Sequence, residues 1–353
     1  MVYMKREALT AFCFEALKRA GASEQDAKVT AETLTETEAW GTHSHGVKNL
    51  YNYIMKCEQG GASLTARPTI IRESVSTAVI DANACLGMVS SCEGMELAIQ
   101  KAKTTGIAMV TVVNSTHFGA AGYYANLAAR QGLIGIAMSN VDANMTLPGA
   151  RCTAIGNSPL AYAVPSNKVP SIFLDIAMSN VAGLKVVKAK NAGTKIPFTW
   201  IIDENGRPTD DPSKYPKQGA LLPLAMHKGY GLAVMVEVLT GIIAGAPNSA
   251  TGEIPSWCYD LDKPNKVSHT FIAINPEMFM GDGSIADETE AYASRLRSLP
   301  RADDCDRIYT PGEMEWEHYA KAEENGIPIP DDVEAELRKL ADKFDLVLPV
   351  LEP

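Results

Sequence analysis

The chain has 353 residues, of which 46% are hydrophobic and 21% charged, and its formal net charge is -10. These values exclude a collagen-like or disordered chain, and the acidic balance leaves no cationic surplus to bind the phosphates of a nucleic acid. The length exceeds that of a usual single domain, so we expect two lobes or one enlarged α/β domain that acts on a small molecule.

Residues 5–58 have the pattern of helices. The stretch KREALTAFCFEALKRAG ends at Gly21, SEQDAKVTAETLTETEAWG begins with Ser23 as its cap, and a third helix is expected after His45. Charges run through the first helix, whereas a secretory signal has an uninterrupted apolar centre. The seven cysteines form no CxxC pair, which favours reduced thiols. We therefore predict a cytoplasmic protein.

From residue 69 the pattern becomes an alternation of β-type and helical segments. TIIRESVSTAVIDAN, GIAMVTVVN and GLIGIAMSN are short runs typical of strands. MVSSCEGMELAIQKAKTTG and GAAGYYANLAARQG lie between them and have helical periodicity. This alternation predicts an α/β sheet that is covered by helices.

The second half of the chain adds four strand candidates, SIFLDIAMSN, LKVVKAK, FTWIIDENGRPT and HTFIAINP, with a turn at Asn205-Gly206. Residues 246–268 are predicted to form a long surface loop. GLAVMVEVLTGIIAGA is too short for a membrane span and contains Glu237, so we expect a buried helix there. The last predicted helices lie near 286–299, 312–325 and 331–343.

Two glycine-containing stretches near predicted helix starts are candidates for phosphate binding. A Rossmann fold would show G-x-G-x-x-G between its first strand and helix, and no such pattern occurs early in the chain. The nearest match, GDGSIA at 281–286, lacks a surrounding βαβ unit. HKGYGLAVMVEVLTG places Lys228 and two glycines at a helix start, which suits an anionic ligand such as a cofactor phosphate. A tight turn into a core helix explains this stretch equally well.

Histidines supply the candidate chemistry. In NSTHFGAAGYY, His117 lies at a strand-to-helix junction, and an ordinary pKa of about 6.5 suits proton exchange. The alternative is that Thr116 or His117 caps the following helix.

The stretch GTHSHGVKNL has the H-x-H spacing of two metal ligands, but no HExxH motif or cysteine pair accompanies it, so metal binding is the minority interpretation. If Ser44 caps a helix here, His45, Asn49 and Tyr53 recur every four residues on one face and could line an anion-binding pocket.

Six blocks extend along the chain in this order: THSHGV, NSTHFGAAGYYANLAARQGLIGIAMSN, NSPLAYAVPS, FLDIAMS, MHKGYGLAVMVEVLTG and YTPGE. Together they resemble the type 2 malate/L-lactate dehydrogenase family, which includes relatives that act on sulfolactate, ureidoglycolate and diketogulonate. The resemblance implies an NAD- or NADP-dependent oxidoreductase that interconverts a 2-hydroxy acid and its 2-oxo acid. It also implies a homodimer with active sites near the subunit contact.

The fold expected with this resemblance is α/β, with a non-Rossmann mixed β-sheet flanked by helices and a helical domain built from both ends of the chain. We expect residues 1–68 to form an N-terminal helical segment, 69–300 the core that binds cofactor and substrate, and 301–353 a C-terminal helical segment packed on the first. No membrane partner is expected.

The resemblance further implies roles for individual residues. His117 matches the proton-exchanging histidine of the family. Ser44 and His45 match its substrate-side SHG pair, to which a proton-donor role has also been assigned. The predicted substrate contacts are Asn49, Tyr53 and Asp142. The predicted cofactor contacts are Asp175, Ile176, Ala177, Lys228, Gly229, Pro311, Gly312 and Glu313. No metal ligand is predicted.

One position departs from the family pattern. Members that act on carboxylate-bearing substrates commonly show SHGVxR, whereas this chain has Lys48-Asn49. An arginine binds a carboxylate through two charge-assisted hydrogen bonds, while asparagine offers a weaker neutral donor. We therefore expect the preference for a second carboxylate to be weaker, by about ten-fold or more.

Other functions stay open at this point. A cyclic imine reductase would use the same hydride geometry on a C=N bond. A metallohydrolase would use His43 and His45. A non-catalytic binding module is the least favoured alternative, because it would leave THSHG, His117 and HKGYG without a role.

Overall fold

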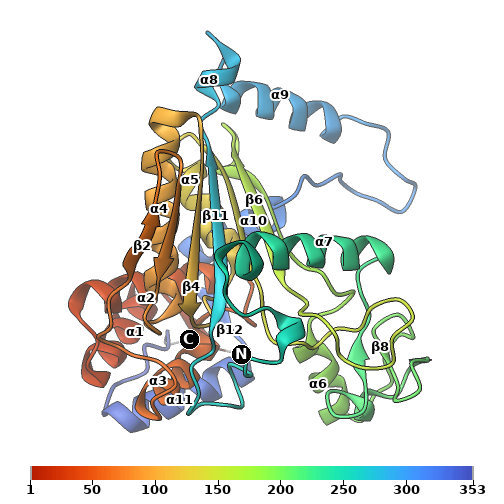
Figure 1. Cartoon of the computed structure of the whole chain (residues 1–353). Helices are drawn as coiled ribbons and strands as arrows, with labels where there is room; N and C mark the ends of the chain where they lie inside the picture. Colours follow the sequence, from red (N-terminus) through yellow and green to blue (C-terminus); the bar gives the residue numbers. More distant parts are fainter. Residues whose placement is uncertain (1, 352–353) are drawn as a thin grey trace.

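The computed structural model describes residues 2–351 and is organised around one seven-stranded sheet (Figure 1). Its strands are β2 (Thr69–Glu73), β3 (Thr77–Asp81), β4 (Ile107–Ser115), β5 (Ile134–Ser139), β6 (Pro159–Pro165), β7 (Ser171–Ala177) and β11 (Val267–Ile274). They lie in the order β2-β3-β4-β11-β5-β6-β7. β3 and β4 run parallel and the other neighbouring pairs are antiparallel, so the sheet is mixed.

Helical layers cover both faces of this sheet. α4 (Gly87–Thr105) contacts β4 and β11, and α5 (Ala121–Ala129) contacts β5 and β6. The Phe271 ring of β11 faces α4 at Gly94, where an added Cβ would lie 2.8 Å from the ring. The adjacent Thr270 donates instead to the Leu239 carbonyl, in the π-helical turn after α7 (His227–Glu237). Because neighbouring strand residues point to opposite faces, α7 and α4 lie on opposite sides of the sheet (Figure 1).

Helices from the two ends of the chain pack together at one end of the sheet (Figure 1). The helices of this layer are α1 (Arg6–Ala20), α2 (Glu24–Ala39), α3 (Leu50–Glu58), α10 (Glu313–Asn325) and α11 (Asp331–Phe344). α11 contacts α1 and α3, and α10 contacts α2. β1 (Val2–Met4) pairs antiparallel with β12 (Ile327–Ile329). The predicted fold class is therefore confirmed, while the boundaries at residues 68 and 300 stay a prediction.

The predicted limits of the first two helices agree with the structure. Gly21 ends α1 with a φ of 104°, a left-handed conformation that favours glycine. The Ser23 hydroxyl accepts a hydrogen bond from the Asp26 N–H at 3.1 Å and so caps α2. Local sequence signals alone define these helix ends.

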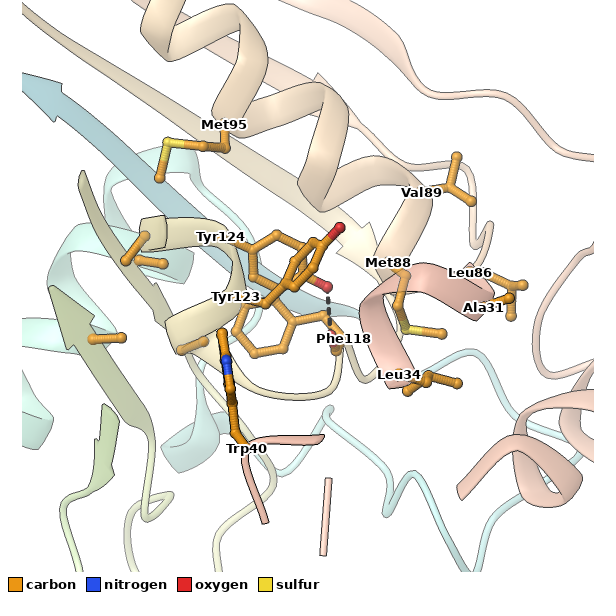
Figure 2. Close-up of a cluster of buried hydrophobic side chains, with 14 of the residues drawn as sticks. Ala31, Leu34, Trp40, Leu86, Met88, Val89, Met95, Phe118, Tyr123 and Tyr124 are labelled. Carbon is orange, nitrogen blue, oxygen red and sulfur yellow. Dashed lines mark hydrogen bonds between the residues drawn. The ribbon is translucent and has the colours of Figure 1, made fainter. Parts of the chain in front are cut away.

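A buried cluster joins the helices of the terminal layer to those on the sheet (Figure 2). Leu34 of α2 and Met88 of α4 are fully buried in it, together with Phe118 and Tyr124. The Tyr124 hydroxyl donates to the Phe118 carbonyl, and the two rings stack with their centroids 4.9 Å apart. The segment that enters α5 is therefore fixed by packing on one side.

A small three-stranded antiparallel sheet lies to the side of the main one. It consists of β8 (Ile201–Ile202), β9 (Pro208–Thr209) and β10 (Ala220–Leu221). The predicted strand LKVVKAK is wrong, because this run lies in the helix α6 (Gly183–Asn191). Val186 is its only buried residue and packs into a local core, so the run has one buried position rather than the alternating set of a strand. The turn at Gly206 is confirmed, with a φ of 79°.

The prediction that α7 is a buried helix is also wrong for this chain taken by itself. Only Gly229, Ala233, Val236 and Glu237 of α7 are buried. Its other face continues past the helix end to Ile243, a residue that is 57% exposed. A helix that is apolar all round usually lies in an interior, so half of this surface lacks a covering layer in the single chain.

The glycine-rich stretch at 281–286 follows the short α8 (Glu277–Met280) and continues into the first residues of a peripheral helix, α9 (Ile285–Arg297) (Figure 1). Its Ser284 hydroxyl accepts a hydrogen bond from the Asp287 N–H, so the stretch forms a helix cap. None of the helices within residues 2–351 is long and apolar enough to cross a membrane.

Candidate functional site

The loop between α2 and α3 carries the SHG motif, and a buried carboxylate holds it in place. Glu38, in the last turn of α2, has no exposed surface. Its Oε2 accepts a hydrogen bond from the Val47 N–H at 3.0 Å, and its Oε1 lies 2.5 Å from Nδ1 of His43. Burial raises the pKa of Glu38, and the bonds to His43 and Val47 oppose that rise. Residues 43–47 are therefore tied to α2 at both ends.

The prediction that Ser44 caps the following helix is wrong. A 3-10 turn (Val47–Asn49) begins after Gly46 and continues into α3, and neither start has a side-chain cap from its own N-cap residue. The Glu38 carboxylate satisfies the first N–H from a neighbouring helix, so a local serine is not required. The Ser44 hydroxyl instead lies 2.9 Å from Nδ1 of His45.

The polar residues around this loop gather at His117, and we call Ser44, His45, Asn49, Tyr53 and His117 the His117 cluster. The Tyr53 hydroxyl of α3 lies 2.6 Å from Nδ1 of His117. The rings of His45 and Tyr53 stack near that of His117, with centroid distances of 5.6 and 5.8 Å. Asn49 is buried and donates from Nδ2 to the Ser44 carbonyl at 2.9 Å. Three segments of the chain thus meet at one imidazole.

Hydrogen bonds assign the tautomer of His117. The Gly119 N–H points at Nδ1 from 3.3 Å, and a backbone N–H only donates, so Nδ1 is an acceptor. Tyr53 therefore donates its hydroxyl proton to the same nitrogen, and the neutral ring carries its proton on Nε2. Loss of hydration lowers the pKa of His117 well below its ordinary value, and the nearby His45 and His269 add to this effect. His117 is a neutral proton acceptor at neutral pH.

Neither Thr116 nor His117 caps α5, so that interpretation is wrong. Asp175 of β7 accepts a hydrogen bond from the Gly122 N–H at 2.7 Å, in the first turn of α5. The Thr116 hydroxyl accepts from the Gly87 N–H at 2.8 Å, where α4 begins. His117 therefore has no structural duty at a helix end.

An aromatic side chain that sequence reasoning missed covers His117. Trp257 belongs to the long loop before β11, and its ring stacks on the imidazole at a centroid distance of 4.2 Å and an interplanar angle of 19°. The buried Lys56 of α3 anchors this loop by donating to the carbonyls of Asp260 and Lys263 at 2.8 and 2.7 Å. In the sequence, the only indication of this role is that Trp257 is a single tryptophan within a polar loop.

The predicted substrate contact Asp142 lies after β5, beside the same loop. Burial raises the pKa of its carboxyl, and the negative charge of Asp260 raises it further. No hydrogen bond among residues 2–351 links Asp142 to the His117 cluster. The structure therefore places Asp142 near the loop that carries Trp257 and outside the hydrogen-bonded group.

The predicted cofactor residues of β7 lie next to those of α7. The Leu224 N–H, shortly before α7, donates to the Met178 carbonyl at 2.8 Å, just after Ile176 and Ala177. An added Cβ at Gly229 would lie 2.7 Å from the same carbonyl, so only glycine permits this approach. Lys228 is exposed, and no hydrogen bond or ion pair of its ammonium group occurs within the described chain.

This junction has the properties of an anion-binding site. α7 begins after Met226 without a side-chain cap, and both Ala225 and Met226 have positive φ angles, of 45° and 55°. Such strain in residues other than glycine is often kept for function. The Ser158 hydroxyl, buried and without a hydrogen-bond partner within residues 2–351, precedes the strand residue paired with Ala177. These groups fit the phosphates and hydroxyls of a dinucleotide.

The third predicted cofactor segment contacts the middle of β7. The Pro311 carbonyl accepts a hydrogen bond from the Phe173 N–H at 3.2 Å, and Gly312 packs against the Phe173 ring. Glu313 is buried, and its carboxylate accepts hydrogen bonds from Thr310, Arg297 and Arg307. Burial opposes ionisation, but these bonds lower the pKa of Glu313 to about 2. Its oxygens are therefore already engaged by protein groups.

The two histidines of the H-x-H motif face different surroundings. His43 pairs with Glu38 and lines a cavity of about 560 Å³ that also contains His318. His45 faces His117 on the other side of the loop. Within residues 2–351, no group of three or more His, Cys, Asp or Glu side chains has the arrangement of a metal site.

Comparison with known proteins gives a match over almost the whole chain. A family model described as malate/L-lactate dehydrogenase matches residues 4–338. The chain is 34% identical over 335 residues to L-sulfolactate dehydrogenase of Methanocaldococcus jannaschii, with 94% of each protein covered.

Solved structures have the same fold. The crystal structure of malate dehydrogenase from Entamoeba histolytica superposes with a TM-score of 0.92 at 31% identity, covering 98% of this chain and 99% of that one. Delta1-piperideine-2-carboxylate reductase from Pseudomonas syringae pvar. tomato superposes with a TM-score of 0.86 at 25% identity, covering 97% of this chain and 100% of that one.

Proposed function

The chain belongs to the malate/L-lactate dehydrogenase family, a family of hydroxy acid dehydrogenases, and we propose that it interconverts a 2-hydroxy acid and its 2-oxo acid with NAD or NADP. The observation that carries this proposal is the neutral His117 bonded through Nδ1 to the Tyr53 hydroxyl. A hydroxy acid dehydrogenase needs an acid–base group that exchanges the hydroxyl proton, and this pair supplies one.

The proton path follows from the tautomer. In the oxidation direction, the substrate hydroxyl gives its proton to the Tyr53 oxygen, and the Tyr53 proton passes to Nδ1 of His117. The ring then holds protons on both nitrogens, and the reverse transfer returns one proton to the substrate oxygen in reduction. Burial raises the pKa of Tyr53, which disfavours a lasting tyrosinate, so His117 is the terminal acceptor and Tyr53 the relay.

A nicotinamide cofactor supplies the hydride chemistry when bound, and the chain positions it. Lys228 and the uncapped start of α7 would hold its phosphates, with the Ser158 hydroxyl and the backbone at Ala177 along the end of β7. Both forms of the cofactor carry the pyrophosphate that these groups would bind. Parallel assays with NADH and NADPH decide which of the two this chain uses.

Within residues 2–351, neither lysine next to the His117 cluster on the chain is free to bind the second carboxylate of a dicarboxylate substrate. Lys48 is paired with Asp332 of α11 at 2.6 Å, and Lys56 is committed to two loop carbonyls. Asn49 stands where the family pattern has arginine. We propose that the preferred substrate carries an uncharged side chain, which fits the aromatic surroundings of His117.

A substrate panel tests this proposal. Pyruvate, larger 2-oxo acids and oxaloacetate are compared with the wild type, Asn49→Arg and the control Lys48→Arg. We expect Asn49→Arg to raise the kcat/KM for oxaloacetate relative to pyruvate by about ten-fold, as a charge-assisted bond replaces a neutral one. Lys48 points to Asp332, so the control should leave the ratio unchanged. An unchanged ratio in Asn49→Arg contradicts the substrate proposal, and inactivity on the whole panel contradicts the dehydrogenase proposal.

Reduction of a cyclic imine is the second candidate. The similar fold of the piperideine carboxylate reductase supports it, since a hydride delivered to C=O in this geometry would also reach C=N. Adding a cyclic 2-imino acid to the same panel separates the two. A higher kcat/KM on the imine than on any 2-oxo acid would favour this candidate.

We also propose that the chain works as a homodimer in the cytoplasm. The uncovered apolar face of α7 and the residues that follow it offers a surface for a second copy, and Ile242 and Ile243 are each more than half exposed. All seven cysteines are free thiols, which fits a reducing compartment.

A further inference from the structure

A third histidine, His269, lies behind the His117 cluster and has no part in the proposed proton path. It sits on β11 between β4 and β5, opposite Ser139, and has no exposed surface. Its Nδ1 lies 2.8 Å from the Ser139 hydroxyl, and its Nε2 lies 3.1 Å from the Thr116 carbonyl. Both ring nitrogens of this buried imidazole therefore contact polar groups of the protein, one on β5 and one just after β4.

The neighbours of His269 assign its protons. Burial lowers the pKa of His269 to about 3, and its bond to the Thr116 carbonyl opposes this only in part, so the ring is neutral at neutral pH. A carbonyl accepts and never donates, so Nε2 carries the proton and donates it to Thr116. Nδ1 is then unprotonated and faces the Ser139 hydroxyl, whose single proton is shared between Nδ1 and the Asn140 carbonyl, each at 2.8 Å. The ring therefore makes two directed bonds without adding a charge to the interior.

Both sequence neighbours of His117 are in contact with His269. The carbonyl of Thr116 accepts its Nε2–H, and the ring of Phe118 lies against it at a centroid distance of 4.3 Å and an interplanar angle of 2°. Phe118 is also stacked against Tyr124, at a centroid distance of 4.9 Å (Figure 2). The peptide before His117 and the side chain after it are thus held by one residue of a different strand.

We propose that His269 is a positioning residue for His117. It sets the direction in which the segment 116–118 leaves β4 and thereby keeps Nδ1 of His117 within reach of the Tyr53 hydroxyl. This inference rests on the proposed function, in which the distance between those two atoms governs proton transfer. A displacement of about 1 Å at a reacting group can lower a rate 100-fold, so a small shift of this segment is sufficient to slow the reaction.

Two variants at position 269 distinguish the contribution of the hydrogen-bond donor of His269 from that of its aromatic ring. His269→Phe keeps an aromatic ring against Phe118 and removes both hydrogen bonds. His269→Gln keeps an amide donor for the Thr116 carbonyl. The control is Thr111→Val on β4, which removes one buried hydroxyl that is paired with Thr270 and lies away from His117. All three are compared with the wild type by thermal unfolding, by kcat and by the KM for the nicotinamide cofactor.

We expect His269→Phe to lower kcat about 10- to 100-fold with the cofactor KM unchanged, and His269→Gln to recover most of that loss. Thr111→Val should lower the unfolding temperature but keep kcat. Wild-type kcat in folded His269→Phe, or a loss in Thr111→Val of the same size, overturns the proposal. If His269→Phe does not fold, Ser139→Ala replaces it, because it removes the hydroxyl that lies 2.8 Å from Nδ1 and leaves the ring. Unchanged kcat in Ser139→Ala overturns the proposal equally.

A measurement that does not need activity distinguishes this inference from the proposed function. The imidazole of His117 is followed by nuclear magnetic resonance as a function of pH in the wild type and in His269→Gln and His269→Phe. We expect the Nε2-protonated tautomer in the wild type and in His269→Gln, and a mixture of tautomers in His269→Phe. Identical spectra in all three overturn the positioning role even if the protein reduces 2-oxo acids. Inactivity of the wild type together with the expected spectra would refute only the proposed function.

Discussion

Removing the Tyr53 hydroxyl is the sharpest test of the proton path, because Tyr53→Phe deletes one oxygen and keeps the ring. The deleted O–H lies 2.6 Å from Nδ1 of His117, while the Gly119 N–H still reaches that nitrogen at 3.3 Å. Nδ1 thus keeps a donor, and the change in the free energy of unfolding should be only about 1 kcal/mol. The relay is lost, however, and general acid–base catalysis contributes at least about 100-fold to a rate. We expect kcat to fall by about that factor.

The assay follows the absorbance of the reduced nicotinamide in both directions, with Tyr51→Phe as the matched control. Tyr51 lies on the same helix, and its hydroxyl has no hydrogen-bond partner in the described part of the chain. If Tyr53 and His117 act as a unit, adding Tyr53→Phe to His117→Gln should cost little more than His117→Gln alone. Wild-type kcat in Tyr53→Phe, or independent additive losses in the double variant, would refute the relay.

Three further outcomes are expected. Because the pKa of His117 lies well below about 6.5, the kcat/KM for hydroxy acid oxidation should stay constant from alkaline pH down to about pH 6 and fall only below it. The reduction of a 2-oxo acid should become faster as the pH falls. Rate profiles measured in both directions check these two expectations. Lys228→Met should raise the cofactor KM about 10- to 100-fold with little change in kcat, and exposed Lys217→Met should change neither in the same initial-rate assays. Ile243→Lys should shift a dimer towards monomer in sedimentation velocity, and a monomeric wild type would refute the dimer proposal.

Local signals in the sequence were sufficient for much of the fold. Gly21 and Ser23 mark helix ends through backbone conformation and a side-chain cap, and both act on residues only a few positions away. The predicted alternation of strands and helices between residues 69 and 139 also agrees with the structure. LKVVKAK failed because its β-branched residues favour a strand locally, while packing of Val186 against a distant core favours a helix.

The site was harder to predict because its decisive contacts join distant parts of the chain. A serine before a helix usually caps it, which predicts this role for Ser44, but the Glu38 carboxylate of the preceding helix binds the Val47 N–H instead. Trp257 and His269 come from a loop and a strand more than 130 residues after His117. No periodicity or spacing connects residues so far apart. Only the folded chain brings Trp257 onto the His117 imidazole and His269 against the residues on either side of it.

The positions that hold the site differ in kind from those that would touch the substrate. Glu38 binds the Val47 N–H, Lys56 binds two carbonyls of the Trp257 loop, and His269 binds the Thr116 carbonyl. Each is a buried polar side chain that bonds to backbone. They fix, in turn, the loop 43–47, the loop that carries Trp257 and the segment 116–118. An isolated buried polar group is costly, so these bonds must form whenever the chain is folded. Substitutions at such anchors should therefore lower kcat through lost geometry and leave the cofactor KM almost unchanged. Substitution of Lys228 should raise the cofactor KM and leave kcat almost unchanged.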